Sequence, residues 1–198
     1  MEGCSKWKRF LNNAIGDEPL IAALQEFFGS CLSPRQFGRM LILAGPPESG
    51  KSTISNILTA IVGSERVSYA PLSRLGNQFT LAEMSRKQVN ISDCDDTKDF
   101  NQAELKAILH GDPLTASFKF KPPFIFTPEI KLVSIQRELP AGLDKSPGIF
   151  RRMLIVQLRQ PTNREDNLLS QLKMELAEIK AWAEEGLRRL EKNGSFSD

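Results

Sequence analysis

Few residues in this sequence suit a zinc, redox or disulfide-based site. The three cysteines, Cys4, Cys31 and Cys94, match no zinc or redox motif in their spacing, and their odd number favours reduced thiols over a disulfide framework. The single histidine, His110, stands beside Gly111, and we interpret it as a turn or packing residue without a catalytic role. Side chains for a metal or redox function of these kinds are therefore largely missing.

Long apolar runs are missing as well. No run approaches the roughly 20 apolar residues that a membrane span needs, and the N-terminus, MEGCSKWKRF, has no signal-peptide core. We therefore expect a cytoplasmic protein without a membrane partner. The net charge is only +2, so a nucleic-acid partner must be argued from the local placement of Lys and Arg rather than from composition.

The chain does contain alternating strand and helix patterns. Short apolar runs predict buried strands at Met40–Ala44 and at residues 89–92, 131–135 and 153–158. Apolar spacings of three and four predict two short helices within residues 6–30 and helices at 52–62, 102–109 and 167–191, with room for one interruption in the last. The Phe-rich segment at 112–126 predicts a β-hairpin, and the tail NGSFSD is expected to be frayed.

Together with the glycine-rich stretch GPPESGKST, which follows the first of these strands, the elements predict one α/β protein, a three-layer sandwich of the P-loop AAA+ type with a mainly parallel sheet. Helical segments are expected to flank this core at both ends. We expect an N-terminal helical segment over residues 1–30, an ATPase core over 31–160 that carries the hairpin near 112–126, and a C-terminal helical segment over 161–198.

The clearest motif is the stretch GPPESGKST, which follows the strand at Met40–Ala44 and opens the next helix. Such a loop turns backbone N–H groups and the positive end of a helix dipole toward a phosphate. Lys51 would neutralise β- and γ-phosphate oxygens, and the Ser52 hydroxyl would ligate Mg²⁺. The residues expected to bind the nucleotide are Gly45, Pro46, Pro47, Glu48, Ser49, Gly50, Lys51, Ser52 and Thr53.

A second acidic element follows in the stretch VNISDCDD. Asp93 is predicted at the carboxyl end of a strand, where ligands bind in open parallel sheets, and we expect it to join Ser52 in holding Mg²⁺. The plainer interpretation, an acidic turn that caps the next helix, fits Asp95 and Asp96 well.

The order of these motifs resembles the C-terminal helicase domain of phage and plasmid primases, including poxvirus primase-helicase relatives, within the superfamily 3 AAA+ helicases. The resemblance spans about residues 7–196. The segments that carry it are LQEFFG, GPPESGKST, VNISDCDD, LKAILHGDPLTASFKFKPPFIFTPEIKL, ELPAGLDKSPGIFRRMLIVQL and GLRRLEKNGSF. The phosphate loop alone is generic, whereas the hairpin segment and the LP…D…RR element that follows it are specific.

The resemblance implies a ring, in this family a hexamer, that hydrolyses ATP and moves along single-stranded DNA. It implies DNA contacts by Lys119 and Lys121 on the hairpin and by Lys106 upstream, whereas without it these lysines would read as ordinary solvent-facing residues. It also implies that Arg151 or Arg152 reaches the ATP of a neighbouring subunit, although a surface salt bridge would explain such a pair too.

Two positions depart from the family pattern. Arg137 stands where relatives carry a polar sensor, most often Asn, so that Gln136 would have to take over this contact from the neighbouring position. Cys94 stands where relatives commonly carry a second acid. Both departures concern hydrolysis rather than nucleotide binding.

The sequence therefore leaves three functions open. The first is an ATP-driven DNA helicase or translocase in the replication of a phage, plasmid or other mobile element, with a separate primase or replication protein as a candidate partner. The second is a ring-forming DNA-binding module that binds ATP and hydrolyses it weakly. The third, less favoured because no lid is apparent, is a monomeric P-loop kinase for a small metabolite.

Overall fold

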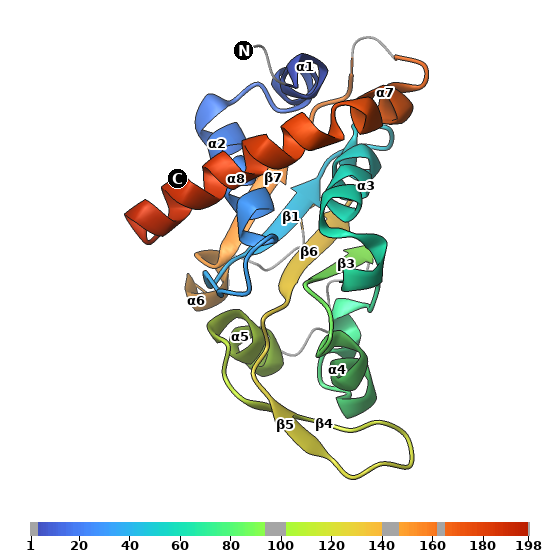
Figure 1. Cartoon of the computed structure of the whole chain (residues 1–198), viewed down its shortest axis with the longest axis vertical. Coiled ribbons are helices and arrows are strands. Elements are labelled where there is room, and N and C mark those ends of the chain that lie inside the picture. The colour runs from blue at the N-terminus through green and yellow to red at the C-terminus, as the bar shows by residue number, and fades with distance from the viewer. Residues whose placement is uncertain (1–3, 94–101, 140–146, 162–164, 198) are drawn as a thin grey trace.

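A five-stranded parallel sheet forms the centre of the molecule, with the strand order β2-β3-β6-β1-β7 (Figure 1). The computed structural model describes residues 4–93, 102–139, 147–161 and 165–197. The strands are β1 (Met40–Ala44), β2 (Val67–Ser68), β3 (Val89–Asp93), β6 (Lys131–Gln136) and β7 (Met153–Gln157). The four predicted strands are confirmed to within about a residue at each end. Strand β2 was not predicted, because two residues are too short for a recognisable strand pattern.

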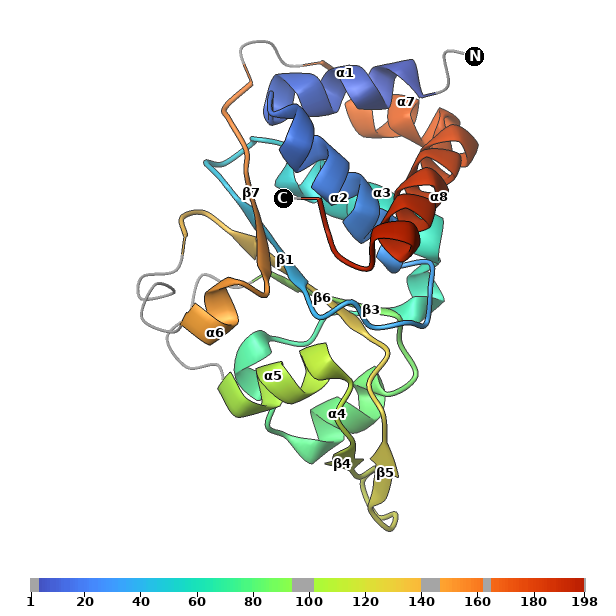
Figure 2. The same ribbon diagram turned by 90° about the vertical axis from the view of Figure 1, so that its left-hand side faces the viewer.

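Helices cover both faces of the sheet, as the alternation of side chains along β1 requires. Leu41 and Leu43 face a core that is shared with α1 (Ser5–Ala14), α2 (Glu18–Ser30), α3 (Lys51–Val62), α7 (Leu168–Met174) and α8 (Leu176–Asn193). Met40 and Ile42 face a second core that includes α4 (Gln78–Met84) and α5 (Gln102–His110). These two helices lie on the other side of the sheet from α2, α3 and α8 (Figure 2). The short elements are η1 (Ser64–Arg66), η2 (Leu72–Arg74) and α6 (Pro147–Phe150). The fold is thus α/β with a parallel sheet between two helical layers.

Helix α2, near the N-terminus, and helix α8, near the C-terminus, cross in close contact. A Cβ placed at Gly29 would lie 2.4 Å from the carbonyl oxygen of Ala183, and one placed at Gly186 would lie 2.4 Å from that of Gln25. The two glycines therefore let the helix backbones touch. Trp182 of α8 packs edge-on against Trp7 and Phe28, with ring centroids 5.7 Å apart in both pairs. This crossing joins the N- and C-terminal segments of the chain.

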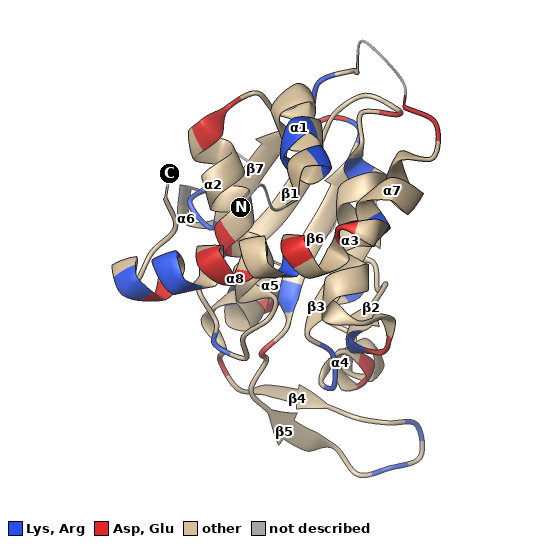
Figure 3. Ribbon diagram, turned by 45° about the horizontal axis from the view of Figure 1, so that its top comes forward, with Lys and Arg blue, Asp and Glu red and all other residues tan. Residues whose placement is uncertain are grey.

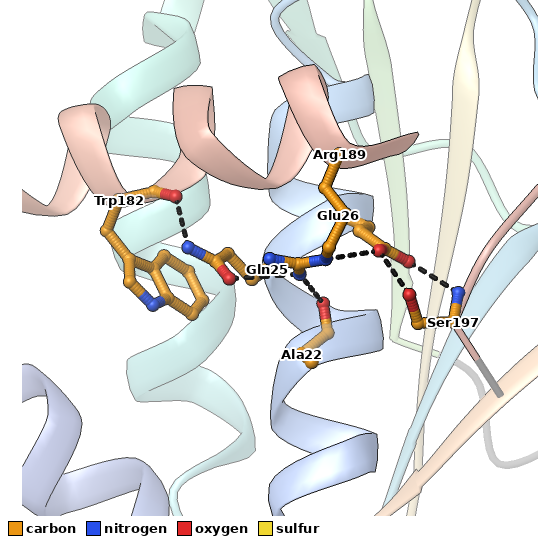
Figure 4. Close-up of polar contacts among 6 residues, drawn as sticks. All are labelled: Ala22, Gln25, Glu26, Trp182, Arg189 and Ser197. Atoms are coloured by element: carbon orange, nitrogen blue, oxygen red, sulfur yellow. Dashed lines mark hydrogen bonds and ion pairs between the residues drawn. The ribbon is translucent and has the colours of Figure 1, made fainter. Parts of the chain in front are cut away.

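A buried carboxylate also ties the C-terminal residues to α2 (Figure 4). Glu26 is fully buried and accepts hydrogen bonds from Arg189 Nε at 2.6 Å and from Ser197 N and Oγ at 2.7 and 2.6 Å. Phe196 is buried and meets Phe37 edge-on. The expectation of a frayed tail is therefore wrong, because tertiary contacts that no local pattern encodes hold Phe196 and Ser197.

The C-terminal helical region is interrupted once, at Glu175. Its carboxylate accepts hydrogen bonds from the backbone N–H groups of Lys6 and Trp7, each at 3.2 Å, in the first turn of α1. A carboxylate at a helix N-terminus satisfies donors that have no partner within the helix. Glu175 thereby links the α7–α8 junction to α1. Among the described helices, none is long and apolar enough to cross a membrane.

The predicted hairpin is confirmed. Strands β4 (Leu114–Ala116) and β5 (Phe124–Phe126) pair antiparallel and project from the end of the molecule below α4 and α5 (Figure 1). The hairpin rests on α4, where Ser117 N donates to the carbonyl oxygen of Gln78 at 3.1 Å. Since β6 begins shortly after β5, the hairpin adjoins the amino edge of the sheet.

Candidate functional site

The loop between β1 and α3 turns sharply at its two glycines. Gly45 has φ +151°, and a Cβ there would lie 2.7 Å from the carbonyl oxygen of Leu158. Gly50 has φ +99°, and a Cβ there would lie 2.8 Å from the Phe10 ring. Glu48 also adopts a positive φ, +65°. The glycines of the motif are therefore needed for this loop conformation.

Lys51 begins α3 and folds back into the loop. Its Nζ donates hydrogen bonds to the carbonyl oxygens of Gly45 at 2.6 Å and Pro46 at 2.7 Å, and to Ser49 Oγ at 3.3 Å. The side chain is buried, so the ammonium group is held within the turn. Of the remaining loop residues, Pro46 and Thr53 are half-buried, whereas Pro47, Glu48 and Ser52 are exposed. The loop thus joins a fixed cation to an accessible hydroxyl at a helix N-terminus.

Ser52 and Asp93 line the same cavity, of about 280 Å³, together with Tyr69 and Ile135. Asp93 is the exposed last residue of β3, and its position follows from the parallel register of the sheet. Because β6 lies between β1 and β3, Ala44 is paired with Gln136, and Asp93 with Ile135. The carboxyl ends of three strands thereby bring the loop, Gln136 and Asp93 to one edge.

Gln136 is buried, and its Nε2 donates to Ser134 Oγ at 2.6 Å. Arg137, which stands where the resemblance led us to expect a polar sensor, is exposed. The residues that follow Asp93, including Cys94, Asp95 and Asp96, lie outside the described residues. Within the described part of the chain, no cluster of three or more His, Cys, Asp or Glu side chains forms a metal site.

Arg151 and Arg152 lie at the opposite edge of the sheet, between α6 and β7, and do not join Lys51 and Asp93. Arg152 donates a hydrogen bond from Nη1 to the carbonyl oxygen of Gly148, and its Nη2 contacts Nε2 of His110. Its backbone oxygen accepts a hydrogen bond from Met40 N at 2.9 Å. Arg151 is exposed. The two arginines therefore differ: Arg152 is engaged within its own chain, and Arg151 faces solvent.

The hairpin carries its cations at the tip (Figure 3). Lys121 N donates to the carbonyl oxygen of Phe118 at 3.0 Å, which closes a turn in which Phe120 has φ +63° and is 95% exposed. Lys119 Nζ lies 5.0 Å from the centroid of the Phe120 ring. Lys106 lies on α5, half-buried, and is not part of the hairpin.

Two features of the hairpin are not apparent from the sequence. Phe118 stacks on Phe124 at 5.6 Å and braces the hairpin, whereas Phe120 points outward. Arg86, which precedes β3, lies over the same Phe118 ring at 5.3 Å, and Lys121 lies 5.9 Å from it. Alternation along a strand would place Phe118 and Phe120 on one face, but the turn ends this alternation before Phe120. The sequence around Arg86 gives no indication of this contact, because the fold brings Arg86 to the hairpin.

The model of DUF5906, a family of unknown function, matches residues 43–152, which is more than half of the chain. Among curated proteins, no sequence matches. Two solved structures with a similar fold are apo forms of the NrS-1 C-terminal region. One has 14% identity and a TM-score of 0.71 over 92% of this chain, and the other has 13% identity and a TM-score of 0.72 over 96%. The chain spans about half of theirs, 45% and 51% respectively.

Proposed function

Because the chain belongs to the DUF5906 family, whose function is unknown, we propose a function from its own site: an ATP-dependent helicase or translocase module that acts on single-stranded DNA. One observation carries the proposal. The loop that holds Lys51 and Ser52 shares an edge of the sheet with Asp93 and Gln136. That combination of cation, hydroxyl, carboxylate and polar side chain suits a nucleoside triphosphate with Mg²⁺.

Each residue of this edge has a proposed role. The loop N–H groups and Lys51 bind the β- and γ-phosphates, and Lys51 exchanges its contacts with the loop carbonyls for phosphate oxygens. Ser52 and Asp93, which line one cavity, would hold Mg²⁺ through their side-chain oxygens, the ligand type that Mg²⁺ prefers. The ion would neutralise phosphate charge. Gln136, at the end of β6 between β1 and β3, orients the attacking water or contacts the γ-phosphate.

Completion of the site requires a second copy of the chain. Arg151 follows α6, at the edge away from the phosphate loop, so it cannot reach the ATP of its own chain. We assign the role in trans to Arg151, since Arg152 is already bound to Gly148 and His110. A ring, a hexamer by the family resemblance, would place each Arg151 at a neighbour's γ-phosphate, where it would stabilise developing negative charge.

The hairpin is the proposed DNA contact. Lys119 and Lys121 supply charge for backbone phosphates, and the exposed Phe120 supplies a flat surface for a base. A bulky residue with positive φ and almost full exposure is costly in a folded protein, which favours a function at this position. The work of the module in replication of a mobile element, with a separate primase or replication protein, rests on the family resemblance.

The first test is ATP binding by the Lys51→Ala variant in the presence of Mg²⁺, measured by isothermal titration calorimetry. We expect the wild type to bind ATP and Lys51→Ala to lose binding by 100-fold or more, because hydrogen bonds to a charged partner contribute about 1.5–3 kcal/mol each. Lys180→Ala, an exposed position on α8, is the matched control and should bind as the wild type does. Unchanged affinity in Lys51→Ala would remove the phosphate loop from the account.

A further inference from the structure

The phosphate loop is flanked by a second cavity, and we infer that this cavity binds the adenine base and ribose of the nucleotide. It has a volume of about 390 Å³, within the range of ligand pockets in proteins. The inference rests on the proposed function and names the part of the substrate that the loop itself does not recognise. A phosphate loop alone binds any nucleoside triphosphate equally.

The two cavities are lined by different sides of α3. Ser52, Ser55 and Asn56 line the cavity that contains Asp93, whereas Thr53 and Gly50 line the second cavity. Positions 52, 55 and 56 share one face of a helix, and position 53 lies about 100° away from position 52. The terminal phosphate belongs beside Asp93 and Gln136, where the hydrolytic groups lie. The nucleoside must therefore leave the loop on the side of Thr53.

The walls of the cavity come from segments far apart in the chain. Phe10, Asn13 and Ala14 of α1 form one wall, and Pro161 and Leu168 form another. The ion pair between Arg9 and Glu165, with Nη2 2.9 Å from Oε1, joins these walls at the rim. Phe10, Ala14, Pro161 and Leu168 give the cavity an apolar part that suits a base. Among the polar residues that line the rest of it, Asp166 offers a carboxylate to the ribose hydroxyl groups.

Phe10 is fixed as a stacking surface. Its ring lies 5.6 Å from that of Trp7, which is fully buried, and it lies so close to Gly50 that a Cβ there would be 2.8 Å from its Cζ. The aromatic ring therefore directly adjoins the last glycine of the phosphate loop. A base whose triphosphate is bound by that loop comes within reach of the ring. Stacking of a base on an aromatic side chain contributes about 1–3 kcal/mol.

Asn13 supplies the group that can tell one base from another. Its exposed amide carries one donor and one acceptor side by side, which match the adjacent N6 donor and N7 acceptor of adenine. Guanine presents two neighbouring acceptors at the corresponding edge, O6 and N7, so a single amide satisfies only one of them. The cavity is therefore expected to favour ATP over GTP.

The test compares ATP, GTP and inorganic tripolyphosphate as ligands of the wild type, Phe10→Leu and Asn13→Ala, each with Mg²⁺, in calorimetric titrations. Phe10→Leu should weaken ATP binding by about 5- to 100-fold, equivalent to a lost stacking contact, and should leave tripolyphosphate binding unchanged. Asn13→Ala should reduce the preference for ATP over GTP by about tenfold, within the discrimination of one bidentate pair. Phe79→Leu, at an exposed position on α4, should bind all three ligands as the wild type does.

The outcomes separate this inference from the proposed function. If the wild type binds neither ATP nor tripolyphosphate, the phosphate loop and the pocket both fail. If ATP binds no more tightly than tripolyphosphate, or if Phe10→Leu weakens both ligands equally, the phosphate loop stands and the base pocket is overturned. Leucine retains most of the packing of Phe10. Thermal unfolding of each variant shows whether a weaker affinity reflects a lost ligand contact or a destabilised fold.

Discussion

At the scale of single residues, the side chain of Glu26 connects three segments of the helical layer. Its carboxylate is fully buried and is shared between Arg189 of α8 and Ser197 of the tail. Arg189 in turn donates from Nη2 to the carbonyl oxygen of Ala22 and to Gln25 Oε1 (Figure 4). A buried charge is tolerated only when its partners are in place, and these contacts fix α8 and the tail on α2.

Replacement of Glu26 by Gln should lower the free energy of unfolding by about 2–3 kcal/mol, because charge-assisted hydrogen bonds to Arg189 and Ser197 are weakened while the shape is kept. Urea denaturation followed by circular dichroism measures this change. Glu178→Gln, an exposed position on α8, is the control and should change the value by less than about 0.5 kcal/mol. Equal stability of the two variants would contradict the role given to Glu26.

Among the elements, α2 and α8 have their backbones in close contact at Gly29 and Gly186. Gly186→Ala would place a Cβ 2.4 Å from the carbonyl oxygen of Gln25, so the helices must separate. We expect a loss of about 1–3 kcal/mol in the free energy of unfolding, the range found for overpacked cores. Gly148→Ala in α6, where a Cβ meets nothing within 4 Å, should not destabilise the protein in the same urea titration and is expected to stabilise it by up to about 1 kcal/mol. A stabilised Gly186→Ala protein would show that helix propensity outweighs packing at this crossing.

The hairpin is the element whose role can be tested separately. Lys119→Ala with Lys121→Ala should weaken binding of single-stranded DNA and reduce the salt slope by about 1.4, or roughly 0.7 for each lost phosphate contact. Phe120→Ala should weaken binding by about 5- to 100-fold with no change in slope, because stacking releases no counterions. Fluorescence anisotropy at several salt concentrations distinguishes the two effects.

The control for the hairpin variants is Ile125→Ala on β5, which is 74% exposed and carries neither charge nor ring. It should bind DNA as the wild type does. If the lysine pair and Phe120 can be replaced without any change in affinity or salt slope, the DNA contact lies on another surface of the molecule.

The sequence predicted the elements whose signals are local. Strand β1 and the end of α3 at Gly63 follow from a continuous apolar run and a glycine stop, and both lie where expected. Helix α4 was not predicted, because its seven residues are too few for a clear periodicity. Other features depend on turns and tertiary contacts: the exposure of Phe120, the burial of Phe196, and the difference between the exposed Arg151 and the hydrogen-bonded Arg152. No local pattern encodes them.

At the scale of the whole molecule, the residues that we propose to be functional lie at two opposite edges of the parallel sheet. The phosphate loop, Asp93 and Gln136 follow the carboxyl ends of strands, whereas Arg151 and the hairpin precede the amino ends of β7 and β6. One copy therefore cannot bring its own arginine to its own phosphate loop. In the ring that we propose, a neighbouring copy would supply the arginine, and ATP turnover would then depend on assembly.

The most direct measurement of the central proposal is ATP turnover by the purified wild type, with and without single-stranded DNA, over a range of protein concentrations, with Lys51→Ala as the blank. The account predicts turnover per chain that rises with protein concentration and rises again when DNA is added, because assembly supplies Arg151 in trans and DNA engages the hairpin. Turnover that is absent beside clear ATP binding, or that is indifferent to both DNA and concentration, would contradict a DNA-driven motor.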